Sequence, residues 1–184
     1  IITVAISDTQ PQLYSELGVA LNKSAVTALT GITEHYGRLV AWKDDSVYNS
    51  KVSNPHSWPD DSAQHEAFVY AVWKGDGEKI QVCKSYHESL FVFKKTKLAV
   101  FGGIGPDDTG NNAYLFRRVE TNGHGCSAPK SVQAIGEDGK NYLVYRSASG
   151  FFATNGNEPA RIGEKIEIPL ESVTLEVQRT GHSF

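Results

Sequence analysis

The 184-residue sequence contains no methionine and only two cysteines, Cys83 and Cys126. One disulfide or two buried thiols fit this pair equally well, and the pair cannot form a zinc site without histidine partners. The chain begins Ile-Ile-Thr. This start and the missing methionine indicate a mature product whose leader has been removed, so we expect a secreted, extracellular protein.

The sequence also lacks an excess of positive charge and a long apolar run. The formal net charge is −3 and the pI is near 6.1, so charge alone recruits neither nucleic acid nor an anionic membrane. No apolar run approaches the roughly 20 residues that span a bilayer. The densest basic run, Lys94 to Lys97, is interpreted as a solvated strand edge that opposes aggregation. With 40% hydrophobic residues, we expect one domain over residues 1–184.

Alternation of apolar and polar residues predicts a mostly β protein. Four segments consist of a β-branched or aromatic run, a polar turn and a second such run: "RLVAWKDDSVYNSKV", "AFVYAVWKGDGEKIQVCKS", "KNYLVYRSASGFFATNG" and "KIEIPLESVTLEVQ". Phe68 to Trp73 is apolar on both faces, as in a central strand, whereas Ile80 and Val82 alternate with polar residues, as in an outer strand. We therefore predict an all-β fold, an antiparallel two-sheet β-sandwich.

One segment differs from the strand pattern. In "GPDDTGNNAYLFRRVE", Asp107 or Asp108 could cap a helix, and Tyr114, Leu115 and Arg118 recur at helical spacing. The sequence predicts one short flanking helix near residues 106–118.

Catalytic patterns are weak. No Gly-x-Ser-x-Gly occurs, and Cys83 lies inside a strand pattern. A ribonuclease-like set of a base, an acid and a phosphate-binding residue could be formed by His35, Glu66, Arg117 and His182. With six histidines in the chain, such a set is easily found by chance. "QHEAF" and "YHESL" each place a histidine beside a glutamate, on opposite faces of a strand, which does not chelate one metal. We assign no catalytic residue, no metal and no cofactor, and expect a protein that is not an enzyme.

The loop "SVYNSKVSNPHSWPDDSAQHE" is a candidate recognition site. Trp58 offers an aromatic ring on which a sugar stacks, and Asp60 and Asp61 offer carboxylates that accept its hydroxyl hydrogens. The alternative is a tryptophan folded over the end of the sandwich with two solvated aspartates.

Several short stretches, in one order, resemble members of the cytolysin and lectin superfamily. "IITVAISDTQP" is similar to the first strand of fungal fruit-body lectins, and "GDGEKIQVCKSYHESL" to a hairpin of theirs. "NKSA", "HYGRLVAW", "PDDTGNNAYLFRRV" and "ESVTLEVQ" resemble segments of the actinoporins, the pore-forming toxins of sea anemones, which share the β-sandwich with those lectins.

The resemblance implies an actinoporin-like fold and a ligand site. Ser24 and Ser85 fall where actinoporins place serines of the choline site, and Tyr114 or Phe116 lies near their tyrosine cluster. The lectin resemblance implies that Tyr86-His87-Glu88 ends a strand that lines a groove. Glu88 would accept hydroxyl hydrogens, His87 would orient Glu88 or donate a hydrogen bond, and Tyr114 with Arg117 would close the far side. The alternative is that His87 and Glu88 only solvate a hairpin end.

Three functions follow, in order of preference. The first is a carbohydrate-binding lectin that recognises cell-surface glycans. The second is a pore-forming cytolysin that binds membrane lipid headgroups such as phosphocholine; "SLFVFKKTK" replaces the apolar loop with which actinoporins meet the bilayer, which favours the lectin. The third is a secreted nuclease. An agglutinin needs at least two sites per particle, so we expect a multivalent chain, a homodimer or a higher oligomer.

Overall fold

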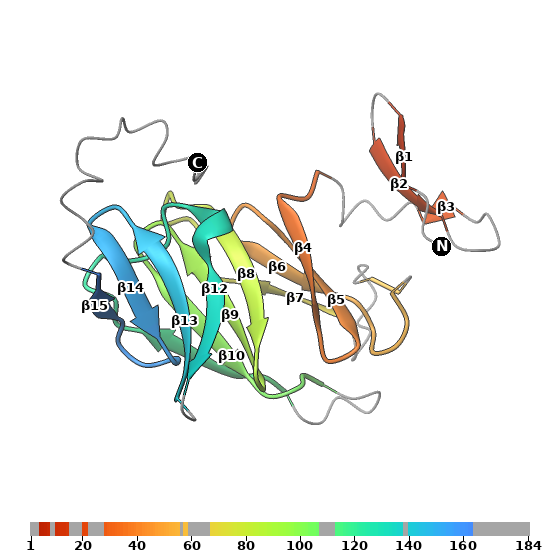
Figure 1. Ribbon diagram of the computed structural model, residues 1–184. Coiled ribbons are helices and arrows are strands. Elements are labelled where there is room, and N and C mark those ends of the chain that lie inside the picture. Colours follow the sequence, from red (N-terminus) through yellow and green to blue (C-terminus); the bar gives the residue numbers. More distant parts are fainter. Residues whose placement is uncertain are drawn as a thin grey trace. The chain divides into compact units, whose positions relative to one another are not determined.

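The protein is mostly antiparallel β-sheet, which confirms the all-β prediction (Figure 1). A computed structural model describes residues 4–7, 10–14, 20–21, 28–55, 57–58, 67–106, 113–137 and 140–163. Within these ranges the one helix is a short 3-10 turn, η2 (Pro129–Ser131), and no helix is long and apolar enough to cross a membrane.

The chain forms two compact units, and each is described by itself. Unit 1 comprises Ile1–Asp76 with Ile104–Tyr114, and unit 2 comprises Gly77–Gly103 with Leu115–Phe184. The expectation of one domain over residues 1–184 remains a prediction.

Unit 1 contains two antiparallel sheets. The first has the order β1 (Val4–Ser7), β2 (Gln10–Tyr14), β3 (Ala20–Leu21), and the second has the order β4 (Gly31–His35), β5 (Arg38–Lys43), β6 (Ser46–Asn49), β7 (Phe68–Ala71). Two-residue turns join β4 to β5 and β5 to β6. At the first turn Tyr36 and Gly37 have φ of 47° and 73°, the left-handed pair that matches the twist of a tight hairpin.

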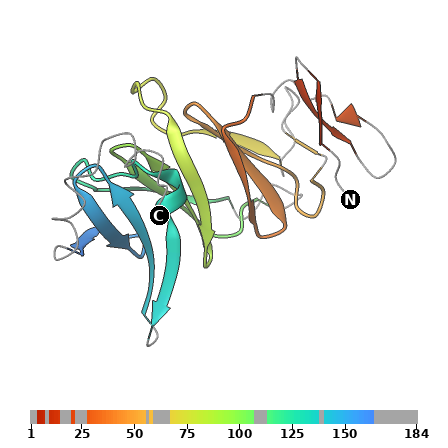
Figure 2. The ribbon, with the colours of Figure 1, turned by 45° about the horizontal axis from the view of Figure 1, so that its top comes forward.

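Unit 2 contains two four-stranded antiparallel sheets (Figures 1 and 2). One has the order β11 (Leu115–Val119), β10 (Leu98–Gly102), β9 (Ser89–Lys94), β8 (Ile80–Tyr86), and the other has the order β12 (Gln133–Glu137), β13 (Lys140–Ser147), β14 (Gly150–Thr154), β15 (Ala160–Ile162). η2 precedes β12.

The two sheets of unit 2 share one core. The first sheet contributes Phe91, Phe93, Leu98, Val100 and Val119, the second contributes Leu143, Tyr145 and Phe152, and Cys126 and Val132 complete the cluster. The rings of Phe93 and Tyr145 lie 4.9 Å apart between centroids. Each buried ring or branched chain stabilises the fold by about 1.5–3 kcal/mol relative to exposure, so this cluster holds the two sheets together.

The helix predicted near residues 106–118 is wrong where the structure can be compared. Leu115–Val119 is strand β11, paired with β10 from Leu98↔Val119 to Gly102↔Leu115. The helical spacing of Tyr114, Leu115 and Arg118 does not determine the structure of this segment, because pairing with β10 makes it a strand. Residues 107–112 lie outside the described residues.

The predictions for Phe68 to Trp73 and for the basic run of Lys94 to Lys97 are also corrected. Phe68–Ala71 lies at the end of its sheet and alternates between half-buried and exposed, so it is not a central strand. The strands buried on both faces are β9 and β10. Lys94 ends β9 with 0% of its surface exposed, so the basic run is not wholly a solvated edge. β8 lies at a sheet end, as predicted for Ile80 and Val82.

Both cysteines are buried free thiols. Burial raises the pKa of the Cys126 thiol to about 11 and that of Cys83 well above its usual value. Of the two arrangements open to the sequence, the structure therefore has two inert thiols rather than a disulfide.

Candidate functional site

His87 and Glu88 form the two-residue turn that joins β8 to β9. Both side chains are exposed, and His87 has a φ of 49°. The rings of Tyr86 and His87 lie 4.3 Å apart between centroids at an interplanar angle of 61°. The carbonyl of Glu88 accepts a hydrogen bond of 2.7 Å from the Gly103 amide, which ties the turn to the end of β10.

A gap in a row of side chains lies beside this turn. Strand register aligns Tyr86, Ser89, Gly102 and Leu115 across β8, β9, β10 and β11, so their side-chain positions share one face of the sheet. Among the described atoms, a Cβ added at Gly102 would meet only the Cβ and carbonyl oxygen of Leu115, both at 3.7 Å. We call this open position, bordered by Tyr86, Ser89 and Leu115, the Gly102 gap.

Arg117 lies two residues after Leu115 on β11, where it pairs with Val100, so it shares the face of Leu115. Its guanidinium donates hydrogen bonds of 2.7 Å to the carbonyl of Gly156 and 3.4 Å to Asn157 Oδ1. Gly156 has a φ of +99°, and a Cβ there would approach Arg117 Nη2 to 3.1 Å and Phe91 Cζ to 3.5 Å, so this close approach depends on glycine. A guanidinium carries five N–H donors, so these two bonds fix Arg117 and leave other donors for a ligand.

The surface near the gap mixes apolar and polar groups. Leu115 is 75% exposed, and Tyr86 is half-buried against Phe91, with ring centroids 6.2 Å apart. The hydroxyl of Ser89, the carboxylate of Glu88 and the guanidinium of Arg117 supply acceptors and donors. This combination suits a neutral, hydroxyl-rich molecule that has one apolar face.

Of the residues predicted to line the groove, the structure brings three into unit 2 on this sheet: His87, Glu88 and Arg117. Ser85 also lies on β8, but successive residues of a strand face opposite sides, so it does not share the face of Tyr86. Ser24 lies outside the described residues.

Tyr114 belongs to unit 1, where it is buried. Its ring centroid lies 5.3 Å from that of Phe68 and 5.9 Å from that of His35. Burial raises the pKa of Tyr114 to about 12, and the nearby positive charge of Arg38 opposes that shift. Tyr114 is therefore part of a buried cluster in unit 1.

The second candidate site is only partly described. Trp58 belongs to unit 1 and is 1% exposed, so its ring faces are covered, as in the alternative of a tryptophan folded over the sheet. Its indole Nε1 has no hydrogen-bond partner within the part of the chain that the structure describes. Asp60 and Asp61 lie outside the described residues.

The groups of the nuclease hypothesis are distributed over both units. His35 is fully buried in unit 1, and Arg117 lies in unit 2. Glu66 and His182 lie outside the described residues. No group of three metal-binding side chains occurs among the residues that could be searched.

One contact between a hydroxyl and a histidine was not predicted. Ser149 Oγ lies 2.7 Å from His124 Nδ1 at the exposed turn between β13 and β14. The imidazole stacks on Phe152 with centroids 4.6 Å apart. In the described ranges no carboxylate hydrogen-bonds to His124, so the pair lacks the orienting group of a catalytic triad.

Sequence reasoning also missed Ser89, Gly102 and Leu115. The signal was the Gly102-Gly103 pair directly after the strand pattern "LAVF", because a glycine inside a strand pattern marks a place where another group approaches the backbone closely.

No protein-family model matches this chain, and a search of curated proteins gives no match to its sequence. The resemblance to the cytolysin and lectin superfamily therefore remains a prediction.

Proposed function

We propose that the protein binds glycans at the Gly102 gap of unit 2. The observation that carries this proposal is the open strand position at Gly102, which is bordered by the ring of Tyr86, the hydroxyl of Ser89 and the exposed Leu115. Arg117, two residues along β11, is held by its hydrogen bonds on the same face. A pyranose ring placed over Gly102 would set its apolar face against Leu115 and the ring of Tyr86. Its hydroxyls would reach Ser89, Glu88 and the remaining N–H groups of Arg117.

The all-β architecture is compatible with both the lectin and the cytolysin of the sequence prediction, and the groups around the Gly102 gap are the reason for preferring the lectin. We propose that the two sheets of unit 2, joined by one core, form the predicted sandwich of the actinoporin-like type. Secretion and self-association, expected for an agglutinin, belong to the same proposal.

A glycan-array scan followed by calorimetry on the strongest neutral sugar tests the function. Losing a charge-assisted acceptor costs about 1.5–3 kcal/mol, roughly tenfold to a hundredfold in Kd. Glu88→Ala and Arg117→Gln should each weaken binding by that factor. Glu88→Ala should also leave the melting temperature unchanged, because the Glu88 side chain is exposed.

A double variant, Asp60→Asn with Asp61→Asn, is the matched control. If it abolishes binding while Glu88→Ala and Arg117→Gln are silent, the glycan site lies in the loop of Trp58. If sphingomyelin vesicles leak on addition of the protein and no neutral glycan binds, the cytolysin alternative replaces the lectin.

A further inference from the structure

The outer face of the second sheet of unit 2 carries a different set of groups from the Gly102 gap. Leu143, Tyr145 and Ser147 of β13 are buried, and the first two belong to the core. Alternation along β13 therefore turns Tyr142, Val144 and Arg146 to the opposite face. We call this opposite face the outer face; the strand pairing extends it to Gln133, Ile135, Phe151, Ala153, Ala160 and Ile162.

Most side chains on the outer face are apolar. Ile135 pairs with Tyr142, and the two residues are 50% and 37% exposed. Val144 pairs with Ala153, and Phe151 pairs with both Arg146 and Ile162. Apolar side chains from four neighbouring strands on one accessible face are characteristic of a recognition surface rather than of isolated exposed residues.

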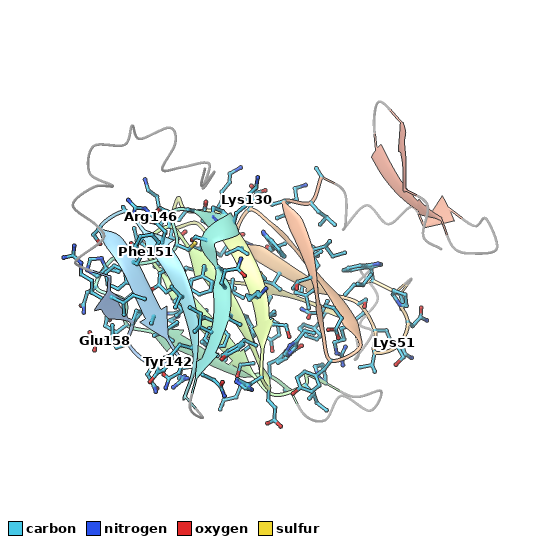
Figure 3. The ribbon with its side chains drawn as sticks, in the orientation of Figure 1. Lys51, Lys130, Tyr142, Arg146, Phe151 and Glu158 are labelled. Carbon is cyan, nitrogen blue, oxygen red and sulfur yellow. The ribbon has the colours of Figure 1, made fainter. Side chains whose placement is uncertain are left out.

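Arg146 is fixed in place on this face. Its guanidinium carbon lies 5.2 Å from the centroid of the Phe151 ring, a cation–π contact, and its backbone amide donates a hydrogen bond of 2.8 Å to Ser131 Oγ. Figure 3 shows Arg146 and Phe151 together near one end of β13 and β14. Within the described residues the guanidinium makes no hydrogen bond and no ion pair, so its N–H edges are available to a ligand.

The charged side chains that the structure describes near the Arg146 end of this face are positive; strand register places Glu137 and its partner Lys140 at the other end of β12 and β13. At its own end, Arg146 is the one charged side chain described on the face itself, and the exposed Lys130 lies on η2, next to the Ser131 that anchors β13. A planar, preorganised guanidinium binds a carboxylate through two parallel N–H···O bonds. The complementary ligand group is therefore an anion.

We propose that the outer face is a second binding site, specific for acidic oligosaccharides. The carboxylate of a uronic-acid unit binds Arg146, and a neighbouring sugar ring stacks on Tyr142. Tyr142 lies four residues from Arg146 along β13, about 13 Å, toward the other end of the strand in Figure 3. A single sugar ring does not bridge that distance, so the ligand is an oligosaccharide.

This site is independent of the Gly102 gap, because the gap lies on the other sheet of the unit. Two sites on one chain would also supply the two contacts that cross-linking requires without a dimer.

The test is calorimetric titration of the full chain with oligogalacturonate, with a neutral glucan oligomer of equal length and with a single-stranded oligonucleotide. The native protein should bind oligogalacturonate alone. Arg146→Gln should weaken this binding about tenfold to a hundredfold, Arg146→Lys should lose most of the same factor because it lacks the fork, and Tyr142→Ala should weaken it severalfold.

Arg118→Gln is the matched control, because Arg118 also lies over a ring, that of Phe116, at 6.0 Å on β11; it should leave oligogalacturonate binding unchanged. Glu88→Ala should also have no effect on this ligand, which separates the outer face from the gap. Equal binding of the neutral oligomer, equal binding of the oligonucleotide, a silent Arg146→Gln or no binding by the native chain would overturn the proposal.

Discussion

The four-stranded sheets of units 1 and 2 bury different side chains. The buried face of β4–β7 in unit 1 includes polar groups, His35, Arg38 and Asn49, beside Val40 and Trp42. Unit 2 buries aromatic and branched side chains between its two sheets. Polar groups are buried in unit 2 as well, among them Lys94 and Thr154, so unit 2 is distinguished by the cluster of rings and branched side chains that its two sheets share.

A buried arginine connects distant segments of unit 1. Arg38 is 1% exposed, and its guanidinium donates to the carbonyl of Ser50 at 3.1 Å and to the carbonyl of Pro106. These bonds connect β5 to segments that follow it by 12 and 68 residues along the chain. In unit 2 the connections between segments far apart in the sequence include ring contacts, such as that of Phe93 with Tyr145, and hydrogen bonds, such as that of Arg117 with the carbonyl of Gly156.

The largest effect should come from removing volume in unit 2. Phe93 is fully buried in the shared core, and Phe93→Ala should lower the free energy of unfolding by about 3–5 kcal/mol, since a cavity adds to the lost transfer energy. Leu115→Ala, on β11 of the same sheet and 75% exposed, should cost less than about 0.5 kcal/mol. Urea denaturation measures both. Equal losses for the two variants would contradict the core described for unit 2.

The burial of Tyr114 in unit 1 should make the protein less stable at high pH. The pKa of Tyr114 is raised to about 12 in the folded protein, above an unfolded value of about 10. The contribution of the neutral Tyr114 hydroxyl to the free energy of unfolding is fully present below pH 10. It is lost as the pH rises from 10 to 12, at about 1.4 kcal/mol per pH unit at most. Tyr114→Phe should flatten this fall in unfolding free energy.

Tyr145 of unit 2 is the counterpart. Burial raises its pKa, and its hydroxyl donates to the carbonyl of His124 at 2.7 Å. Tyr145→Phe should also reduce the alkaline loss of stability, while Tyr142→Phe, at an exposed position, should not. An unchanged alkaline profile in Tyr114→Phe would contradict the burial of that hydroxyl.

A smaller loss is expected from Arg38→Met. The variant keeps an apolar stem but removes the donor to two carbonyls, and an unsatisfied buried acceptor costs about 1–3 kcal/mol. We expect about 2 kcal/mol by urea denaturation. Replacing a buried charge by a well-packed apolar side chain stabilises some proteins. A gain in stability for Arg38→Met would therefore show that packing contributes more than these hydrogen bonds to the stability of unit 1.

The sequence predicted the features that depend on local alternation and turn residues. The all-β class and the outer position of Ile80 and Val82 followed from alternation, and "KDDS" marks the observed turn between β5 and β6. It could not predict which strands lie at sheet centres, because Phe68–Ala71 and the strands β9 and β10 are similarly apolar and only pairing separates them.

The neighbours of the candidate site residues could be predicted only in part, for the same reason. His87 and Glu88 were proposed from the resemblance to fungal fruit-body lectins, and the structure places both in the turn between β8 and β9. The neighbours of that turn are set by the register of four strands, which places Gly102 and Leu115 beside Ser89. Arg117 was selected for its charge, but its anchoring by Gly156 depends on a contact 39 residues away in the chain.

The most direct test of the glycan site is calorimetry on Gly102→Val. The nearest described atoms to a Cβ at this position lie at 3.7 Å, an ordinary contact distance, and valine favours strands, so the fold should keep its melting temperature. Ala134→Val, at an exposed position of β12, is the matched control for added bulk. Gly102→Val should abolish binding of the neutral glycan, and Ala134→Val should bind as the native protein does. Native affinity in a folded Gly102→Val protein would contradict the claim that the sugar occupies the Gly102 gap.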